Sequence, residues 1–259
     1  MAIMNQNTIN GQVYIDCSRC GEMFAAWGPD DDTDIMRMYY GADDRRHCPR
    51  CIQELERLAH AQELRLQLPK MAAEAGIPEL YRIDRETGMP MTAPTVPRVA
   101  AFFEQNRGKN LLVSGPTGVG KSTSACWEAM KLIAEGKRVQ YVKLRKLLAD
   151  WRDVRTSSTS YACGRFFQEI GKLDLLILDE VADKVKMTES GQELMFELLD
   201  MIADGEIRTR MWILGNFRAG VLRELFGDAD PVYRRIQENF VCVGIDRHTI
   251  ERIEVWRAQ

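Results

Sequence analysis

One segment, GPTGVGKS at residues 115–122, constrains this chain more than any other. It fits the pattern G-x-x-x-x-G-K-[ST] completely, follows the apolar run LLVS and opens a stretch with helical spacing. Glycines in such a loop let consecutive backbone N–H groups face a phosphate, and the positive end of the following helix adds to the attraction. The pattern predicts a nucleotide-binding strand, loop and helix, with a chance glycine-rich turn as the alternative.

The same segment predicts which residues hold ATP and its Mg²⁺. Lys121 is expected to reach the terminal phosphates, where it assists catalysis, and the hydroxyl of Ser122 is expected to bind Mg²⁺. The residues expected to contact ATP are Gly115, Pro116, Thr117, Gly118, Val119, Gly120, Lys121, Ser122 and Thr123.

A second motif, LLILDE at residues 175–180, places two acids after an apolar run. Ligands of open parallel sheets bind beyond the carboxyl ends of the strands, so Asp179 is expected to bind Mg²⁺ there. Glu180 suits a general base that polarises the attacking water, and the pair favours hydrolysis of a nucleoside triphosphate over small-molecule phosphoryl transfer. An acidic turn after a core strand is the alternative.

A third strand, MWIL at residues 211–214, ends at Gly215 and Asn216. If this strand lies beside the Asp179 strand, the amide of Asn216 is placed to orient the water or to contact the γ-phosphate. Gly-Asn is also a common turn, which is the alternative.

Short apolar runs alternate with amphipathic stretches after Pro97, and this pattern predicts an α/β domain with a parallel sheet and crossover helices. The expected strands are residues 111–114, 138–142, 175–178, 211–214 and 241–245, and the expected helices are residues 123–134 and 189–203.

Residues before Pro97 predict a separate, smaller domain. From Ile52 the chain carries apolar residues near helical spacing, which predicts an amphipathic helix that Pro69 ends. Five prolines lie between residues 69 and 97, which favours a linker. We therefore predict a first domain at 1–68, a linker at 69–97 that wraps onto the next domain, and an ATPase domain at 98–259; the cysteines described next make the domain at 1–68 a zinc-binding one.

Four cysteines form two Cys-x-x-Cys pairs: Cys17, Cys20, Cys48 and Cys51. Four thiolates are the usual shell of structural Zn²⁺, and two pairs in an acidic, core-poor segment favour a metal over redox chemistry. His47 adjoins Cys48 and is the substitute ligand, although a surface position suits it better. Because this segment lacks a core, zinc is expected to supply its folding free energy.

Charge limits the contacts with nucleic acid. Lys+Arg 35 against Asp+Glu 38 leaves a formal charge of -3, so DNA binding requires a local patch. The first candidate is the stretch 143–165, and an ordinary surface helix and loop explain it equally well. Its residues are Lys143, Arg145, Lys146, Arg152, Arg155, Tyr161 and Arg165; a weaker candidate is the pair Lys184 and Lys186.

No apolar run approaches the roughly 18 residues of a membrane span. The first residues also lack the basic start and apolar stretch of a signal peptide. We therefore expect no membrane partner and a cytoplasmic protein.

Together these motifs resemble the AAA+ ATPases, and the closer resemblance is to the DnaC/IstB-like group, which includes bacterial and phage replicative helicase loaders. It covers roughly residues 77–245 and includes AGIP at 75–78, FFQEIGKLDLLILDE at 166–180 and YRRI at 233–236. The resemblance implies that Asn216 is sensor 1 and that Arg234 or Arg235 is an arginine finger acting on a neighbouring subunit's ATP. We favour Arg235 as the arginine finger. The alternative is that Arg234 and Arg235 are both solvated residues on a helix. The 24 residues after Arg235 are too few for the helical lid domain of many AAA+ proteins.

The resemblance implies a function in replication, in a bacterial cell and encoded by a bacterium or a phage. We expect an ATPase that forms a homo-oligomer and loads a DnaB-type ring helicase onto single-stranded DNA, with residues 1–68 binding the helicase. The alternatives are an IstB-like transposition helper and a zinc-dependent adaptor that uses ATP as a binding switch. A further alternative is that the zinc segment serves only the stability of the protein.

Overall fold

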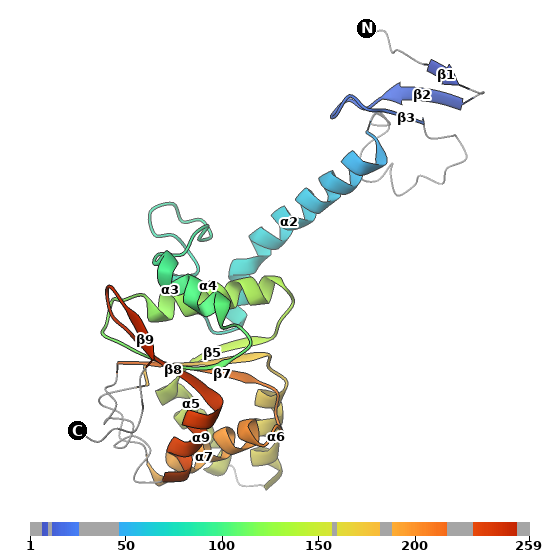
Figure 1. The fold of residues 1–259 in the computed structure, drawn as a ribbon. Helices are drawn as coiled ribbons and strands as arrows, with labels where there is room; N and C mark the ends of the chain where they lie inside the picture. Colours follow the sequence, from blue (N-terminus) through green and yellow to red (C-terminus); the bar gives the residue numbers. More distant parts are fainter. Residues whose placement is uncertain are drawn as a thin grey trace. The chain divides into compact units, whose positions relative to one another are not determined.

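The computed structural model describes residues 7–9, 12–25, 47–156, 160–181, 188–216 and 230–252. The chain divides into two compact units, Met1–Arg65 and Leu66–Gln259 (Figure 1). Among the described residues, no helix has both the length and the apolar character needed to cross a membrane.

The first unit is a small antiparallel sheet followed by the start of a helix. Strands β1 (Asn7–Ile9), β2 (Gln12–Asp16) and β3 (Met23–Ala25) pair in that order, and α2 (Pro49–Glu74) begins directly after Cys48. The buried cluster of this unit consists of Cys17, Cys48 and Cys51, with Phe24 packed against it. Three thiols and one ring are a small core, so the cysteines are central to the stability of this unit.

Helix α2 continues through Pro69, which corrects the prediction that this proline ends the helix. A proline inside a helix leaves the carbonyl four residues earlier, that of Arg65, without its usual donor. The residues that follow compensate for this loss, because Ala72 is buried in the core of the second unit and the Arg82 guanidinium donates to the Pro69 carbonyl at 2.8 Å. The division between the two units falls at Arg65, the residue whose carbonyl loses its usual donor at Pro69.

The expected linker packs onto the second unit. Ile77 is 2% exposed, and the carbonyl of Ala75 accepts a hydrogen bond of 2.7 Å from the backbone N–H of Tyr141. A short 3-10 helix, η1 (Glu79–Tyr81), follows.

The second unit alternates helices and strands. Its elements are α3 (Pro97–Gln105), β4 (Asn110–Ser114), α4 (Lys121–Ala134), β5 (Val139–Lys143), α5 (Leu144–Thr156), α6 (Ser160–Gly171), β6 (Leu175–Asp179), α7 (Glu189–Ala203), β7 (Arg210–Gly215), α9 (Asp230–Asn239), β8 (Phe240–Ile245) and β9 (Ile250–Arg252).

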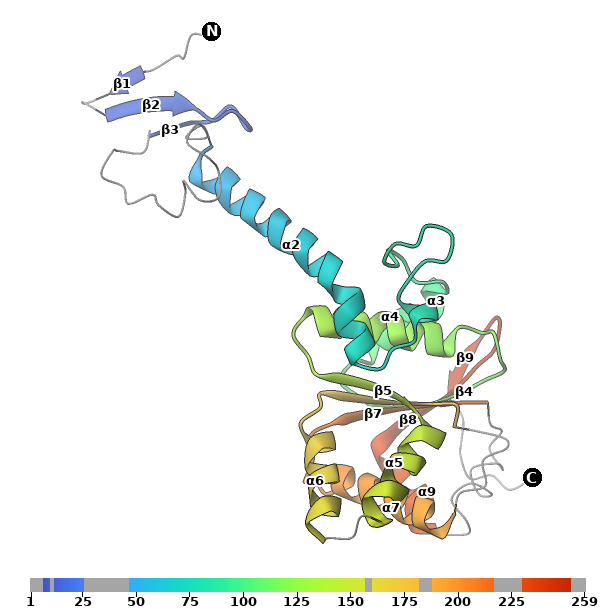
Figure 2. The ribbon, with the colours of Figure 1, turned by 180° about the vertical axis from the view of Figure 1, so that it is seen from behind.

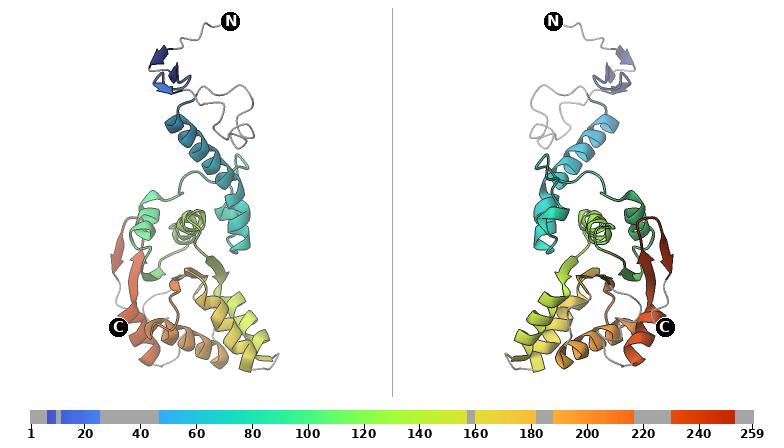
Figure 3. Two further views of the ribbon diagram at one scale, coloured as in Figure 1. Left: turned by 90° about the vertical axis from the view of Figure 1, so that its right-hand side faces the viewer. Right: turned by 90° about the vertical axis from the view of Figure 1, so that its left-hand side faces the viewer.

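These strands form one sheet in the order β5-β6-β7-β4-β8-β9, in which all neighbours are parallel except the antiparallel pair β8 and β9. Helices α3 and α4 cover one face, and α5, α6, α7 and α9 cover the other (Figures 2 and 3). Because successive strand residues point to opposite faces, Leu111 and Val113 enter the core beneath α3 and α4 while Leu112 enters the other core.

The predicted α/β fold with a mostly parallel sheet is confirmed, and each expected strand lies within one residue of an observed one at both ends. The short antiparallel strand β9 was not predicted. The sheet order matters for function, since β4, β6 and β7 are direct neighbours and their carboxyl ends lie at one edge.

Candidate nucleotide site and cysteine cluster

The edge formed by the carboxyl ends of β4, β6 and β7 brings the three predicted motifs together. The loop 115–120 follows β4, Asp179 ends β6, and Asn216 follows β7. Two backbone hydrogen bonds tie these ends to one another, from Gly115 N–H to Gly215 O at 3.2 Å and from Val181 N–H to Leu214 O at 3.0 Å. The expectation that the Asn216 strand lies beside the Asp179 strand is confirmed.

Lys121 stands at the first position of α4 and is 8% exposed. Its Nζ donates to the carbonyl oxygens of Gly115 at 2.6 Å and Pro116 at 2.9 Å, so the ammonium lies inside the loop. Burial lowers the pKa of Lys121, and the negative charge of Asp179 partly offsets that shift. A cation held inside a ring of backbone groups is suited to bind a phosphate chain.

Two glycines of this loop are required by close contacts. A Cβ on Gly120, whose φ is +91°, would lie 2.5 Å from a methyl carbon of Val96. A Cβ on Gly115 would lie 2.2 Å from the carbonyl oxygen of Ile245, at the end of the neighbouring strand β8. The loop therefore has no room for a side chain at Gly115, beside β8, or at Gly120, beside Val96.

Replacing Gly115 with alanine is expected to destabilise the second unit by about 1–3 kcal/mol, because the methyl group must displace strand backbone rather than a flexible side chain. Thermal unfolding without nucleotide measures this effect. The matched control is Gly164→Ala in α6, where a Cβ meets nothing within 4 Å and the expected change is a gain of about 0.5–1 kcal/mol. Equal melting temperatures for the two variants would contradict the steric argument.

Asp179 is 4% exposed, and both of its carboxylate oxygens accept hydrogen bonds. The hydroxyl of Tyr141 donates to Oδ2 at 2.6 Å, and the backbone N–H of Glu180 donates to Oδ1 at 2.7 Å. Burial and the charge of Asp179 raise the pKa of Tyr141 far above its ordinary value, so the tyrosine remains a donor. The Asp179 carboxylate and the Ser122 hydroxyl are hard oxygen ligands that fit Mg²⁺.

Tyr81 lies against this pair from η1. Its ring meets that of Tyr141 edge-on, with centroids 6.5 Å apart. Burial and the charge of Asp179 raise the pKa of Tyr81, while a hydrogen bond with Ser122 and the charge of Lys143 act in the opposite direction. The expected linker therefore reaches the side chains predicted to bind Mg²⁺.

Glu180 is the one described non-glycine residue with a positive φ, at 57°. This left-handed backbone turns its side chain out to solvent, where Oε1 lies 2.5 Å from Nζ of Lys143 at the end of the neighbouring strand β5. The hydrogen bond with Glu180 raises the pKa of Lys143. Backbone strain at a residue of this kind is typical of functional sites.

Arg235 lies on α9 and is engaged within its own chain. Its guanidinium forms an ion pair with Asp200 of α7 and stands 5.2 Å from the ring centroid of Phe196. The side chain of Arg234 lies outside the described residues. A role for Arg235 on a neighbouring subunit therefore requires its pair with Asp200 to exchange.

Replacing Arg235 with alanine is expected to lower the free energy of unfolding by about 1–3 kcal/mol, because Asp200 loses the cation with which it forms an ion pair and Phe196 loses the cation beside its ring. Urea denaturation of the isolated protein measures this loss. Arg152→Ala, an exposed position on α5, is the control and should change stability by less than about 0.5 kcal/mol. An Arg235→Ala protein as stable as this control would contradict the intrachain role.

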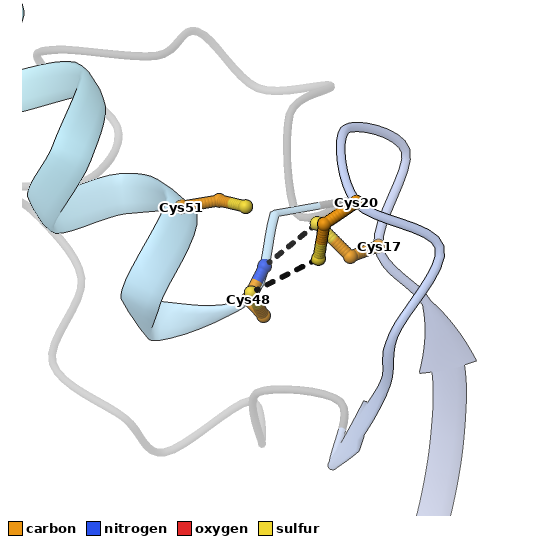
Figure 4. Close-up of side chains that lie close together, drawn as sticks. All are labelled: Cys17, Cys20, Cys48 and Cys51. Carbon is orange, nitrogen blue, oxygen red and sulfur yellow. Dashed lines mark hydrogen bonds between the residues drawn. The ribbon is translucent and has the colours of Figure 1, made fainter.

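The four predicted zinc ligands come together in the first unit (Figure 4). Their Sγ atoms all lie within 4.8 Å of one another, and those of Cys20 and Cys48 are 3.8 Å apart. A tetrahedral ion with Zn–S bonds of about 2.3 Å holds its sulfur ligands about 3.8 Å apart, so the donor set fits Zn²⁺. Cys17 and Cys20 come from the turn between β2 and β3, and Cys48 and Cys51 from the start of α2.

Backbone N–H groups support the cluster. The N–H of Cys48 donates to Sγ of Cys17 at 3.4 Å. Burial raises the pKa of the Cys17 thiol, but N–H groups of Cys48, Cys20 and Arg19 outweigh it and lower the pKa to about 5. His47 lies outside the four-thiol group, since its Nδ1 is 2.9 Å from the hydroxyl of Ser18.

The basic stretch after β5 is partly neutralised within the chain. Lys143 pairs with Glu180, Lys146 with Asp150 at 3.0 Å, and Arg155 with Glu193. The aromatic Tyr161 is 76% exposed, while Lys184 and Lys186 lie outside the described residues. The stretch keeps its exposed aromatic, but three of its cations have acidic partners.

The sequence model of a protein family described as "IstB-like ATP binding protein" matches residues 54–230. The chain belongs to this family. The predicted resemblance to DnaC/IstB-type AAA+ ATPases is thereby confirmed, and the chain is an ATP-binding protein of this type.

Two relatives of this IstB-like chain come from insertion sequences. It is 28% identical over 121 residues to the ATP-binding protein of insertion sequence IS1162 of Pseudomonas fluorescens, covering 47% of this chain and 51% of the relative. It is 26% identical over 146 residues to the insertion-sequence ATP-binding protein y4pL of Sinorhizobium fredii, covering 55% of this chain and 57% of the relative. The IstB-like chain thus matches about half the length of each of these curated relatives.

A solved structure, that of the DnaC helicase loader, superposes on the IstB-like chain with a TM-score of 0.49 at 17% identity. The superposition covers 65% of this chain and 100% of the other.

Sequence reasoning missed Tyr141, Tyr81 and the pairing of Lys143 with Glu180. A polar-tipped tyrosine in the middle of the apolar run VQYV was the available signal. The role of this tyrosine could not be predicted from the sequence, because it depends on which strand lies beside β5.

Proposed function

We propose that this chain is an ATPase that loads a DnaB-type ring helicase onto single-stranded DNA. One observation carries the proposal: a separate four-cysteine unit precedes the ATP-binding domain, and most of it lies outside the residues matched by the family, 54–230. The ATPase does not need such a unit to bind nucleotide, so the four-cysteine unit is available to dock a partner. Membership in the IstB/DnaC family supports the interpretation that this unit is attached to an ATP-driven motor domain.

In this proposal each residue of the sheet edge has one task. Lys121 and the loop N–H groups bind the β- and γ-phosphates, and Ser122 and Asp179 hold Mg²⁺, which supplies charge neutralisation on the phosphates. Glu180 accepts a proton from the attacking water, and Asn216 orients that water beside the γ-phosphate. For Glu180 to act, its carboxylate must leave Lys143, because the ion pair engages the oxygen that would accept the proton.

The proposal includes a homo-oligomer in which Arg235 of one subunit reaches the ATP of the next. A guanidinium supplied in trans compensates charge that develops on the γ-phosphate. Mixing Lys121→Ala chains with Arg235→Ala chains tests this step, because mixed assemblies regain sites with an intact loop and an intact arginine. Hydrolysis that stays at the level of the separate variants would exclude an arginine in trans at position 235.

The loader role is tested by electron microscopy of the full chain mixed with a candidate helicase, an ATP analogue and an oligonucleotide. The proposal expects the four-cysteine unit on the helicase ring and the ATPase domains on the DNA strand. Docking through the ATPase domain alone would contradict this division of labour.

A transposition helper is the second candidate, favoured by the two insertion-sequence relatives. Such a protein is expected to assemble along duplex DNA in the presence of ATP without any helicase. Sedimentation with duplex DNA, in parallel with pull-down by the helicase, separates the two candidates.

A further inference from the structure

Tyr141 and Asp179 form a buried polar pair between neighbouring strands. Tyr141 lies on β5 directly opposite Ile177 of β6, and Asp179 is two residues further along β6. Two residues of a strand rise about 6.6 Å, so a tyrosine that leans along the strand brings its hydroxyl to the carboxylate. The hydrogen bond between them is 2.6 Å long, and each residue is 4% exposed.

This contact fixes the orientation of the Asp179 carboxylate. Its other oxygen accepts the N–H of Glu180, so a donor holds each side of the group. Rotation about the terminal bond breaks both hydrogen bonds at once, and a buried carboxylate that loses a donor is penalised strongly.

The tyrosine is itself held in place from its own backbone. The N–H of Tyr141 donates to the Ala75 carbonyl at 2.7 Å. The residue after Ala75 must be glycine, because a Cβ on Gly76, whose φ is +81°, would lie 2.4 Å from the Tyr141 carbonyl oxygen. Tyr81 then packs its ring edge-on against that of Tyr141. The hydroxyl is therefore a preformed part of the site rather than a mobile surface group.

We propose that Tyr141 is a positioning residue of the nucleotide site, which holds the Asp179 carboxylate in the orientation that binds Mg²⁺ with the nucleotide. The inference rests on the proposed function, in which Asp179 is a Mg²⁺ ligand. Partners that orient a metal ligand through hydrogen bonds typically contribute a factor of about 10–100 to metal affinity. Tyr141 acts through Asp179 and does not touch the nucleotide itself.

The test is Tyr141→Phe, which keeps the buried ring and removes only the hydroxyl. Binding of a fluorescent ATP analogue to the full chain is measured while Mg²⁺ is titrated. The half-saturating Mg²⁺ concentration is expected to rise about tenfold, and affinity for the analogue in the presence of EDTA is expected to stay unchanged. Tyr14→Phe, the same chemical change on β2 of the other unit, should leave both quantities at their wild-type values.

A double variant shows whether Tyr141 acts through Asp179. In an Asp179→Asn background, adding Tyr141→Phe should not shift the Mg²⁺ requirement further. An equal shift in both backgrounds overturns the inference, as does an unchanged requirement in the single variant beside a Mg²⁺-dependent wild type. A wild type that binds the analogue without regard to Mg²⁺ overturns the proposed site itself. Thermal unfolding of each variant establishes that it is folded before binding is compared.

Discussion

Replacing Lys121 with alanine is expected to reduce ATP hydrolysis by at least about a hundredfold, the usual loss when a preorganised donor to a reacting oxygen is removed. The structure gives the reason, since the ammonium is buried inside the loop, where it donates to the carbonyls of Gly115 and Pro116. Solvent cannot take its place in the variant. Steady-state hydrolysis with and without single-stranded DNA measures the effect. Binding of an ATP analogue should also weaken.

The matched control is Lys172→Ala, which removes an exposed lysine whose pair is Glu169, three residues earlier. Its hydrolysis rate should equal that of the wild type. A Lys121→Ala protein that is folded and retains the wild-type rate would refute the assignment of the nucleotide site.

Removing zinc is expected to unfold the first unit and to leave the second one folded. Structural zinc sites contribute about 10–16 kcal/mol of binding free energy, and here the thiols make up most of the buried cluster. Hydrogen exchange after chelation should show loss of protection in β2, β3 and the first turns of α2. Protection in β4, β6 and β7, whose core contains no cluster cysteine, should persist.

Metal analysis of cysteine variants provides the control for that experiment. Cys48→Ser should lose the stoichiometric zinc of the wild type, whereas Cys163→Ser, in α6 of the second unit, should retain it. Equal zinc contents in the two variants would exclude the four-cysteine site.

The motifs that sequence reasoning found are local ones. The loop 115–122 lies between a strand and a helix that its own residues specify, and each Cys-x-x-Cys pair is a chelating unit by spacing alone. Sequence also predicted the five parallel strands of the second unit, since each apolar run has a length and composition suited to a buried parallel strand, but it missed β9 and the three strands of the first unit. The prediction that the helix ends at Pro69 was wrong, because the helix is supported by tertiary contacts: Ala72 is buried in the core, and Arg82 donates to the Pro69 carbonyl.

The residues that complete the site depend on strand neighbours. Lys143 meets Glu180, and Tyr141 meets Asp179, because β5 lies beside β6, a pairing between segments separated by two helices. The same holds for Arg235, which meets Asp200 where α9 packs near α7. Spacing along the chain carries no information about such contacts.

The sequence by itself determined that this protein has a nucleotide loop, an acidic strand end and four zinc-type thiols, because each is encoded within a few consecutive residues. Only the tertiary structure decided which side chains hold those groups in place. The order of strands in the sheet, and the face on which each helix packs, set which distant residues come within hydrogen-bond reach, and these choices depend on the packing of the whole core.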